Sequence, residues 1–131
     1  MGQFATIFKS TVYKNGTGLI TALLKDITGA NYSPSDISSI KYSIYNKGVN
    51  STATPVAVTG HTNVPLSVGN VMFAPENKTY DSQTFLRNFE WIPDISENDI
   101  FTVTGNVYQV RVDIQPVNGF CSPMIIEFLV I

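Results

Sequence analysis

The chain has 131 residues, of which 44% are hydrophobic and only 14% are charged, and its formal net charge is −2. This length is typical of one domain, and a chain of this size buries roughly two-thirds of its unfolded surface, so a core can form without disulfides. The 8 basic residues are not clustered, so the composition argues against nucleic acid and against an anionic membrane as partners.

The first two predicted elements are strands joined by a turn. TIFKSTVY, residues 6–13, is the first strand candidate, and residues 1–14 as a whole form either that strand or an N-terminal arm. Asn15-Gly16 follows, which is a strong hairpin signal. The apolar spacing of LITALLKDI, residues 19–27, also suits a short helix. We favour a strand, because a loop follows this segment and the first strand candidate, residues 6–13, could pair with it across the turn.

A third strand is predicted for ISSIKYSIYN, residues 37–46, preceded by a brief helical turn with Ser35 or Asp36 as its cap. Its alternation directs two sets of side chains to opposite faces: Ile40, Tyr42 and Ile44 inward, and Lys41, Ser43 and Tyr45 outward.

Shorter strands are predicted through the middle of the chain. TPVAVTG and VPLSVG carry Pro near their starts, as edge strands do. NVMFAP (residues 70–75) and IFTVTG (residues 100–105) are two more. Between them, QTFLRNFEWIP places Phe89 and Trp91 on the same side.

The last two predicted strands, Val107–Pro116 and Met124–Ile131, pair antiparallel around the loop Val117–Pro123. VYQVRVDI alternates between an apolar set, Tyr108, Val110, Val112 and Ile114, and a polar set, Gln109, Arg111 and Asp113. MIIEFLVI, from Met124 to Ile131, is apolar at every position except Glu127.

No segment keeps a helical period over several turns. The sequence therefore predicts an all-β fold: one antiparallel β-sandwich of seven to nine strands, spanning residues 1–131, with at most short helical turns. We expect nine side chains to be buried in its core, Ile40, Tyr42, Ile44, Phe89, Trp91, Tyr108, Val110, Val112 and Ile114.

Two resemblances follow from these features. GNVYQVRVDIQPVNG (Gly105–Gly119) and its closing strand resemble the last two strands of immunoglobulin-like sandwiches, in which Tyr108 would be a core or corner tyrosine. The small, weakly charged, Asn/Ser/Thr-rich β-domain, with no signal-peptide pattern at its start, is similar to accessory decoration or cement proteins of tailed-bacteriophage virions. That resemblance implies synthesis in a host cytoplasm and a location on the virion.

Residues capable of catalysis are few. His61 is the only histidine, without a nucleophile motif around it, and we expect it in a surface turn. Cys121 is the only cysteine, and we expect an inert thiol that is at least half-buried. The loop Asp94–Asp99 resembles the start of a calcium loop, but it lacks the Gly and Glu of that motif, so we favour a solvated loop. We therefore predict no enzyme activity, no metal and no cofactor.

The closing strand raises the question of what covers its second face. If Met124, Ile126, Phe128 and Val130 point inward, then Ile125, Leu129 and Ile131 point outward, although the opposite phase is open. We expect the cover to be partly the N-terminal segment, with Phe4, Ile7 and Phe8, and partly a neighbouring protein subunit.

Three functions remain open at this point. The first is a capsid decoration or cement protein that binds the major capsid protein or another virion protein, with a head–tail or tail component as its near relative, and we expect a homo-oligomer. The second is a carbohydrate- or surface-binding module, which an exposed Trp91 or a cluster of Tyr42, Tyr45 and Tyr80 beside a groove would favour. The third, a small hydrolase, is disfavoured by the missing catalytic set.

Overall fold

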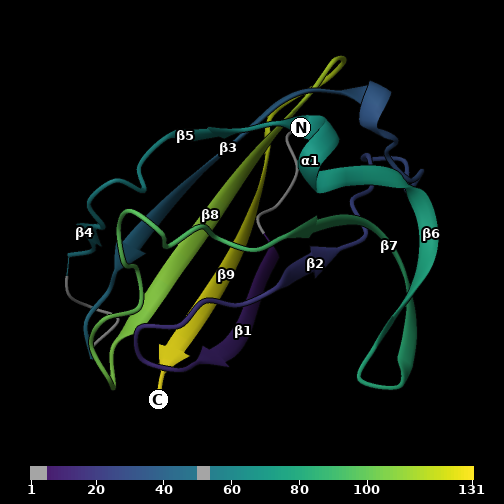
Figure 1. The fold of residues 1–131 in the computed structure, drawn as a ribbon. Helices are drawn as coiled ribbons and strands as arrows, with labels where there is room; N and C mark the ends of the chain where they lie inside the picture. The colour runs from purple at the N-terminus through teal and green to yellow at the C-terminus, as the bar shows by residue number, and fades with distance from the viewer. Residues whose placement is uncertain (1–5, 50–53) are drawn as a thin grey trace.

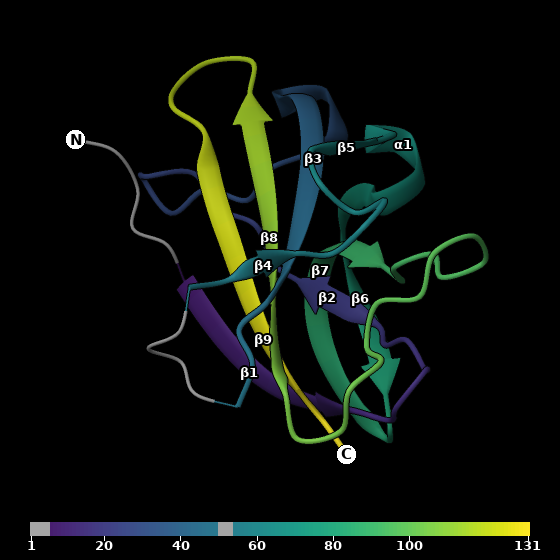
Figure 2. The ribbon, with the colours of Figure 1, turned by 90° about the vertical axis from the view of Figure 1, so that its left-hand side faces the viewer.

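The computed structural model describes residues 6–49 and 54–131, which form two β-sheets with two short helical turns (Figure 1). In chain order the elements are β1 (Thr6–Val12), β2 (Ile20–Ala22), η1 (Pro34–Asp36), β3 (Ile37–Asn46), β4 (Val56–Ala57), β5 (Val64–Leu66), α1 (Val68–Val71), β6 (Met72–Tyr80), β7 (Gln83–Trp91), β8 (Val107–Pro116) and β9 (Ser122–Val130). Figure 2 shows the two sheets as separate layers. The prediction of an all-β sandwich is confirmed. No helix among the described residues is long and apolar enough to cross a membrane.

The larger sheet has the strand order β1-β9-β8-β3-β4, and β5 also pairs with β3. The smaller sheet has the order β2-β7-β6. Every pairing is antiparallel except that of β1 with β9, which is parallel. The larger sheet therefore presents one face to the core and leaves the opposite face, spread over β9, β8 and β3, to the outside.

The core lies between the two sheets, and its predicted membership is confirmed. Each of the nine predicted core side chains is at most 8% exposed. Tyr42 from β3 packs against Trp91 from β7 with a distance of 4.6 Å between ring centroids, which joins the layers. Lys41 and Arg111, which alternation directs outward, are exposed. The period of two along β3 and β8 was therefore assigned in the correct phase.

The predicted hairpin of the first two strands is wrong, although a tight turn is present. Asn15 adopts a left-handed φ of 61° there. β1 pairs with β9, while β2 pairs with β7 in the other sheet. The turn crosses between the layers because Asn15 N donates to Phe101 O at 2.7 Å, and Thr17 Oγ1 donates to Pro93 O at 2.8 Å. These bonds tie the turn to the loop that follows β7 rather than to a neighbouring strand.

The predicted strand over residues 19–27 is only three residues long, because a side chain replaces its ladder partner. Asn88, which is fully buried on β7, accepts a hydrogen bond from Leu24 N at 2.7 Å. Its amide nitrogen donates to Leu24 O at 2.9 Å and to Tyr32 O at 2.8 Å. The chain after β2 is thus held to β7 through one amide group, without strand pairing.

Two short segments also differ from the prediction. The helical turn lies earlier, at Pro34–Asp36, with Ser33 as its N-cap and Ser33 N donating to the Asp36 carboxylate at 2.8 Å. Residues 100–105 form no strand, because Phe101 turns inward instead. Its side chain is 0% exposed, and its ring packs edge-on against Tyr108 at 5.5 Å between centroids.

The segment predicted as a short strand at residues 70–75 is the start of a long hairpin. α1 ends at Val71, and β6 then pairs with β7 around a turn at Asp81 and Ser82. These two residues have φ angles of 48° and 67°, a conformation that sequence patterns usually assign to Gly. The end of this hairpin extends away from the sandwich, and the first four residues of β7 are exposed (Figure 1).

The last two strands are confirmed as an antiparallel pair, with Val112 opposite Met124 and Tyr108 opposite Phe128. β8 has the predicted bounds, and β9 begins two residues earlier than predicted. The inward residues of β9 are buried and come from the first of the two phases considered, Met124, Ile126, Phe128 and Val130.

Candidate functional site

The outer face of the larger sheet gathers polar side chains from neighbouring strands. β3 and β8 are antiparallel, so their outward residues stand opposite one another in three pairs: Tyr45 with Gln109, Ser43 with Arg111, and Lys41 with Asp113. β9 lies on the other side of β8, where it places Glu127 opposite Gln109.

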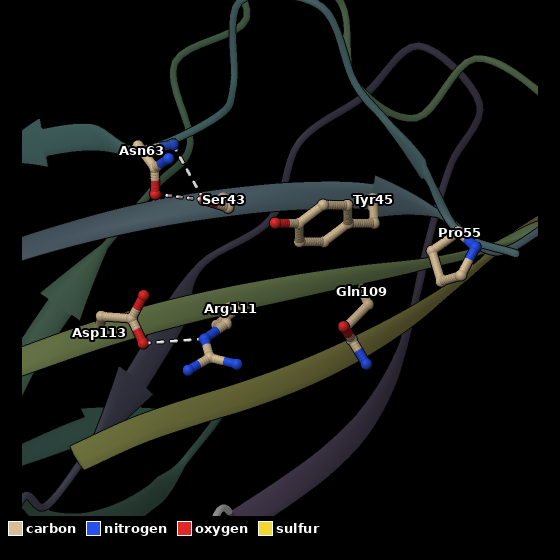
Figure 3. A pocket seen from close by; sticks show the side chains of 7 residues that line it. All are labelled: Ser43, Tyr45, Pro55, Asn63, Gln109, Arg111 and Asp113. Carbon is tan, nitrogen blue, oxygen red and sulfur yellow. Dashed lines mark hydrogen bonds and ion pairs between the residues drawn. The ribbon is translucent and has the colours of Figure 1, made fainter. Parts of the chain in front are cut away.

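A hollow of about 510 Å³ is set into this face, and we call it the outer-face hollow. Figure 3 shows the side chains that line it, contributed by β3, β8 and the segments on either side of β4: Ser43, Tyr45, Pro55, Asn63, Gln109, Arg111 and Asp113. Its floor is the sheet itself, and Pro55 borders the end where Tyr45 lies (Figure 3). The hollow therefore has a rigid floor and both aromatic and polar walls.

Some polar groups in the hollow bond to one another. Arg111 Nε donates to Asp113 Oδ1 at 2.8 Å, and the two form an ion pair. Asn63 N donates to Ser43 Oγ at 2.9 Å. Among the described residues, no partner is found for the Tyr45 hydroxyl, the Gln109 amide or the terminal nitrogens of Arg111. No described residue therefore competes with a ligand for these groups.

The six residues predicted to form an interaction surface are only partly brought together. Phe4 lies outside the described residues, and the side chains of Ile7 and Phe8 also lie outside them. The backbone of β1 runs beside β9, with Ile7 opposite Ile125, so it extends the sheet and does not cover its face. Ile125 is half-buried, while Leu129 and Ile131 are 40% and 50% exposed.

Part of the second face of β9 is covered by a side chain that the sequence did not indicate. Lys47 follows β3, and its ammonium group reaches Glu127 on β9 at 2.7 Å. Both side chains are only 16% exposed. Since β8 lies between these strands, the aliphatic stem of Lys47 must cross the outer face of β8. This ion pair covers the middle of β9 and leaves its C-terminal end open.

His61 is not the surface-turn residue that was predicted. Its side chain is 3% exposed and lies between the sheets beside Tyr42. Nε2 lies 2.8 Å from Asn98 O, which can only accept, so this nitrogen carries the proton. Nδ1 then accepts from the Tyr42 hydroxyl at 2.8 Å. Burial, with Asp94 adding to it, raises the pKa of Tyr42 and keeps the phenol protonated as that donor.

Both nitrogens of His61 are thus engaged in structural bonds, and none of the described residues that line the pocket beside it is Ser, Thr or Cys. Its lining includes Trp91, Asp94 and Glu97. A backbone hydrogen bond from Ser96 lowers the pKa of Asp94. Among the described residues, no group of three His, Cys, Asp or Glu side chains could hold a metal ion.

The prediction for Cys121 is also wrong, because the residue is exposed in the loop between β8 and β9. Partial desolvation raises the pKa of its thiol, and the Asp113 carboxylate adds to this effect against the opposing charges of Arg111 and Lys41. The thiol is therefore held in its less nucleophilic, protonated form.

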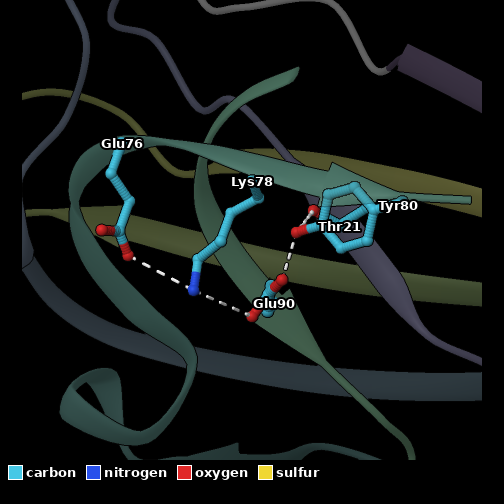
Figure 4. Close-up of polar contacts among 5 residues, drawn as sticks. All are labelled: Thr21, Glu76, Lys78, Tyr80 and Glu90. Carbon is cyan, nitrogen blue, oxygen red and sulfur yellow. Dashed lines mark hydrogen bonds and ion pairs between the residues drawn. The ribbon is translucent and has the colours of Figure 1, made fainter. Parts of the chain in front are cut away.

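A second polar cluster lies on the smaller sheet (Figure 4). Lys78 stands between two carboxylates, 3.3 Å from Glu76 and 3.9 Å from Glu90. The Tyr80 hydroxyl donates to Glu90 and also contacts Thr21 on β2. The bond to Glu76 raises the pKa of Lys78, and desolvation followed by the Glu90 bond raises that of Tyr80. The cluster links all three strands of the smaller sheet through side-chain contacts.

Comparisons with protein-family models, with curated proteins and with solved structures found no match to this chain.

Proposed function

We propose that the protein is a non-enzymatic structural protein that works by binding other protein chains. In its most specific form, the proposal is a decoration or cement protein on a capsid, which bridges neighbouring subunits. The observation that carries the binding role is the open C-terminal end of β9. Leu129 is 40% exposed there, on a strand whose opposite face is buried, and Ile131, which directly follows the strand, is 50% exposed. The virion assignment is supported by composition alone.

The contact at this patch is weak, which favours a role in an assembly that contains many copies of the contact. Burying the exposed parts of two aliphatic side chains contributes about 1–3 kcal/mol. Association of two proteins costs about 4–15 kcal/mol in lost freedom. The patch is therefore too weak to hold an isolated pair, whereas contacts repeated on a lattice act at high effective concentration.

The edge of the larger sheet offers a second mode of contact. β1 is the edge strand, and no described strand pairs with its other side. An open edge can accept a strand from a neighbouring chain through backbone hydrogen bonds. Both the patch and this edge lie on the β1–β9 side of the sheet, which supports one interface that includes both.

The absence of enzyme activity belongs to the same proposal. His61 has no free nitrogen with which to act as a base, since Tyr42 and Asn98 occupy both. A head–tail or tail component would use the same contacts and remains the near alternative. For a surface-binding module, Trp91 and Tyr42 offer no support, because they are buried in the core at 8% and 5% exposure.

The test is to follow the protein through density-gradient purification of particles from the cells that produce it, using an antibody raised against the purified chain. We expect the protein to sediment with capsid particles and to be released intact by mild denaturant. Recovery only in the fractions free of particles would reject the virion role. The binding role has its own test, on Leu129, given at the end of the Discussion.

A further inference from the structure

We propose that the outer-face hollow binds a neutral saccharide. Its site comprises Tyr45, Gln109, Arg111 and Asp113, which lie on adjacent strands and face the same opening (Figure 3). This binding is separate from the proposed protein contacts, which lie at the C-terminal end of β9.

The charges of the hollow favour a neutral ligand. Arg111 is paired with Asp113 through a 2.8 Å contact, and Lys41 stands opposite Asp113 in the register of β3 and β8. Beside the hollow, Lys47 is paired with Glu127. Among the described residues that line the hollow, Arg111 is the only cation and Asp113 the only carboxylate, and Lys41 is not part of the lining. Because Arg111 and Asp113 are paired, the lining offers no excess charge to a phosphate, a sulfate or a carboxylate. A neutral, hydrogen-bonding ligand suits this balance.

The polar groups that have no partner among residues 6–49 and 54–131 match a polyhydroxyl compound. The Gln109 amide offers two donors and an acceptor, and Arg111 offers its terminal nitrogens as donors. The Tyr45 hydroxyl both donates and accepts, and Asp113 keeps one oxygen that Arg111 Nε does not contact. Neighbouring hydroxyls of a sugar ring each need a donor and an acceptor, and these planar groups supply both on one surface.

Two rings provide the apolar contact that a sugar also requires. Tyr45 lies along β3 with its hydroxyl directed away from Pro55, so the aromatic ring and the pyrrolidine stand together at one end of the hollow (Figure 3). Aromatic side chains present a large apolar face together with a polar tip. The C–H face of a pyranose would pack on these rings while its hydroxyls reach Gln109 and Arg111.

The hollow is also suitable in size and rigidity. Its volume of about 510 Å³ lies within the range of small-molecule sites, about 300–1,000 Å³. Tyr45 and Gln109 are opposite one another in paired strands, so the backbone positions that carry their side chains are fixed before a ligand arrives. Groups held in place in this way lose little conformational entropy on binding.

The experiment is an NMR titration of the full-length, ¹⁵N-labelled protein with glucose, galactose, mannose, N-acetylglucosamine and their neutral disaccharides. Sialyllactose and a sulfated disaccharide serve as charged probes. We expect at least one neutral sugar to shift the Gln109 side-chain amide and the Arg111 Nε signal in a saturable way, with weaker or no shifts from the charged probes. Monosaccharides and disaccharides tested side by side distinguish a site for one ring from a site for a chain.

Variants then separate this site from nonspecific contact. Gln109→Ala and Tyr45→Ala should each weaken binding by about tenfold, as loss of one well-placed polar or aromatic contact does. Gln83→Ala, an exposed glutamine at the far hairpin, is the matched control and should bind normally. Thermal melting checks that each variant is folded. The proposal is overturned if no neutral sugar shifts these signals, if the charged probes bind more tightly, or if folded Gln109→Ala and Tyr45→Ala both bind as the parent does.

Discussion

Replacement of His61 tests whether its buried hydrogen bonds are structural. His61→Ala removes two 2.8 Å bonds, to Tyr42 and to Asn98 O, from a site that is 3% exposed. Two net hydrogen bonds are worth about 2 kcal/mol, and the cavity left by the ring adds about 1–2 kcal/mol. We therefore expect the free energy of unfolding to fall by about 3–4 kcal/mol, which corresponds to a fall in Tm of about 10–15 °C for a chain of this size.

The graded control is His61→Gln, whose amide nitrogen can take the place of Nε2 and donate to Asn98 O while the bond from Tyr42 is lost. His61→Gln should lower the free energy of unfolding by about half as much as His61→Ala, on the order of 1–2 kcal/mol. Thermal and urea unfolding followed by circular dichroism measure both variants. Loss of even one buried hydrogen bond should lower the Tm by more than about 2 °C. The structural role of His61 would be refuted if the Tm of His61→Ala lay within about 2 °C of the Tm of the parent.

Two further changes test stability elsewhere. Asn88→Ala removes the three hydrogen bonds that hold the chain after β2, so the free energy of unfolding measured in urea should fall by about 3 kcal/mol. The control is Asn77→Ala at an exposed position, which should change the free energy of unfolding by less than about 0.5 kcal/mol. Equal effects of the two substitutions would contradict the role of Asn88. The pKa of Asp26 is lowered, first by the bond from Thr28, so its ionised form stabilises the fold above the unfolded pKa, and this contribution is lost as pH falls through the lower, folded pKa. Stability measured against pH should therefore show a shallower loss on the acid side in Asp26→Asn, and an unchanged acid limb would contradict this.

The sequence predicted the fold class and the core because alternation along β3 and β8 is long and unambiguous. Ten residues in each strand fix the phase, and a shift of one residue would have exposed Val110 and Val112 together. The phase of β9 could not be decided in this way, since apolar residues occupy both of its faces. It became clear only when Met124 was seen opposite Val112.

The pairing partners could not be predicted, because they depend on distant parts of the chain. Asn15-Gly16 indicates a turn but not whether the turn joins neighbours in one sheet or crosses to the other. The bond from Asn15 N to Phe101 O decides this, and it links residues that local patterns cannot relate. The antiparallel turn at Asp81 and Ser82 was missed for a different reason, since neither residue is Gly.

The outer-face hollow can be predicted from the sequence only in part. Alternation correctly directed Tyr45 and Gln109 outward, but their proximity requires the register of β3 and β8. For His61 the prediction from the sequence was wrong. Its polar neighbours in the sequence indicate an exposed turn, but hydrogen bonds with the Tyr42 hydroxyl and with Asn98 O make its burial favourable.

The central claim is that the open end of β9 binds other protein chains, and Leu129→Asp tests it most directly. Val117→Asp is the matched control, because Val117 is 59% exposed in the loop at the other end of the strand. Co-sedimentation with purified particles measures binding to the repeated sites of a lattice, and sedimentation velocity checks that the free protein does not assemble by itself. We expect Leu129→Asp to melt within about 3 °C of the parent, as an exposed site allows, yet to lose association with the particles, while Val117→Asp retains it. Normal melting together with normal association in Leu129→Asp would contradict the claim.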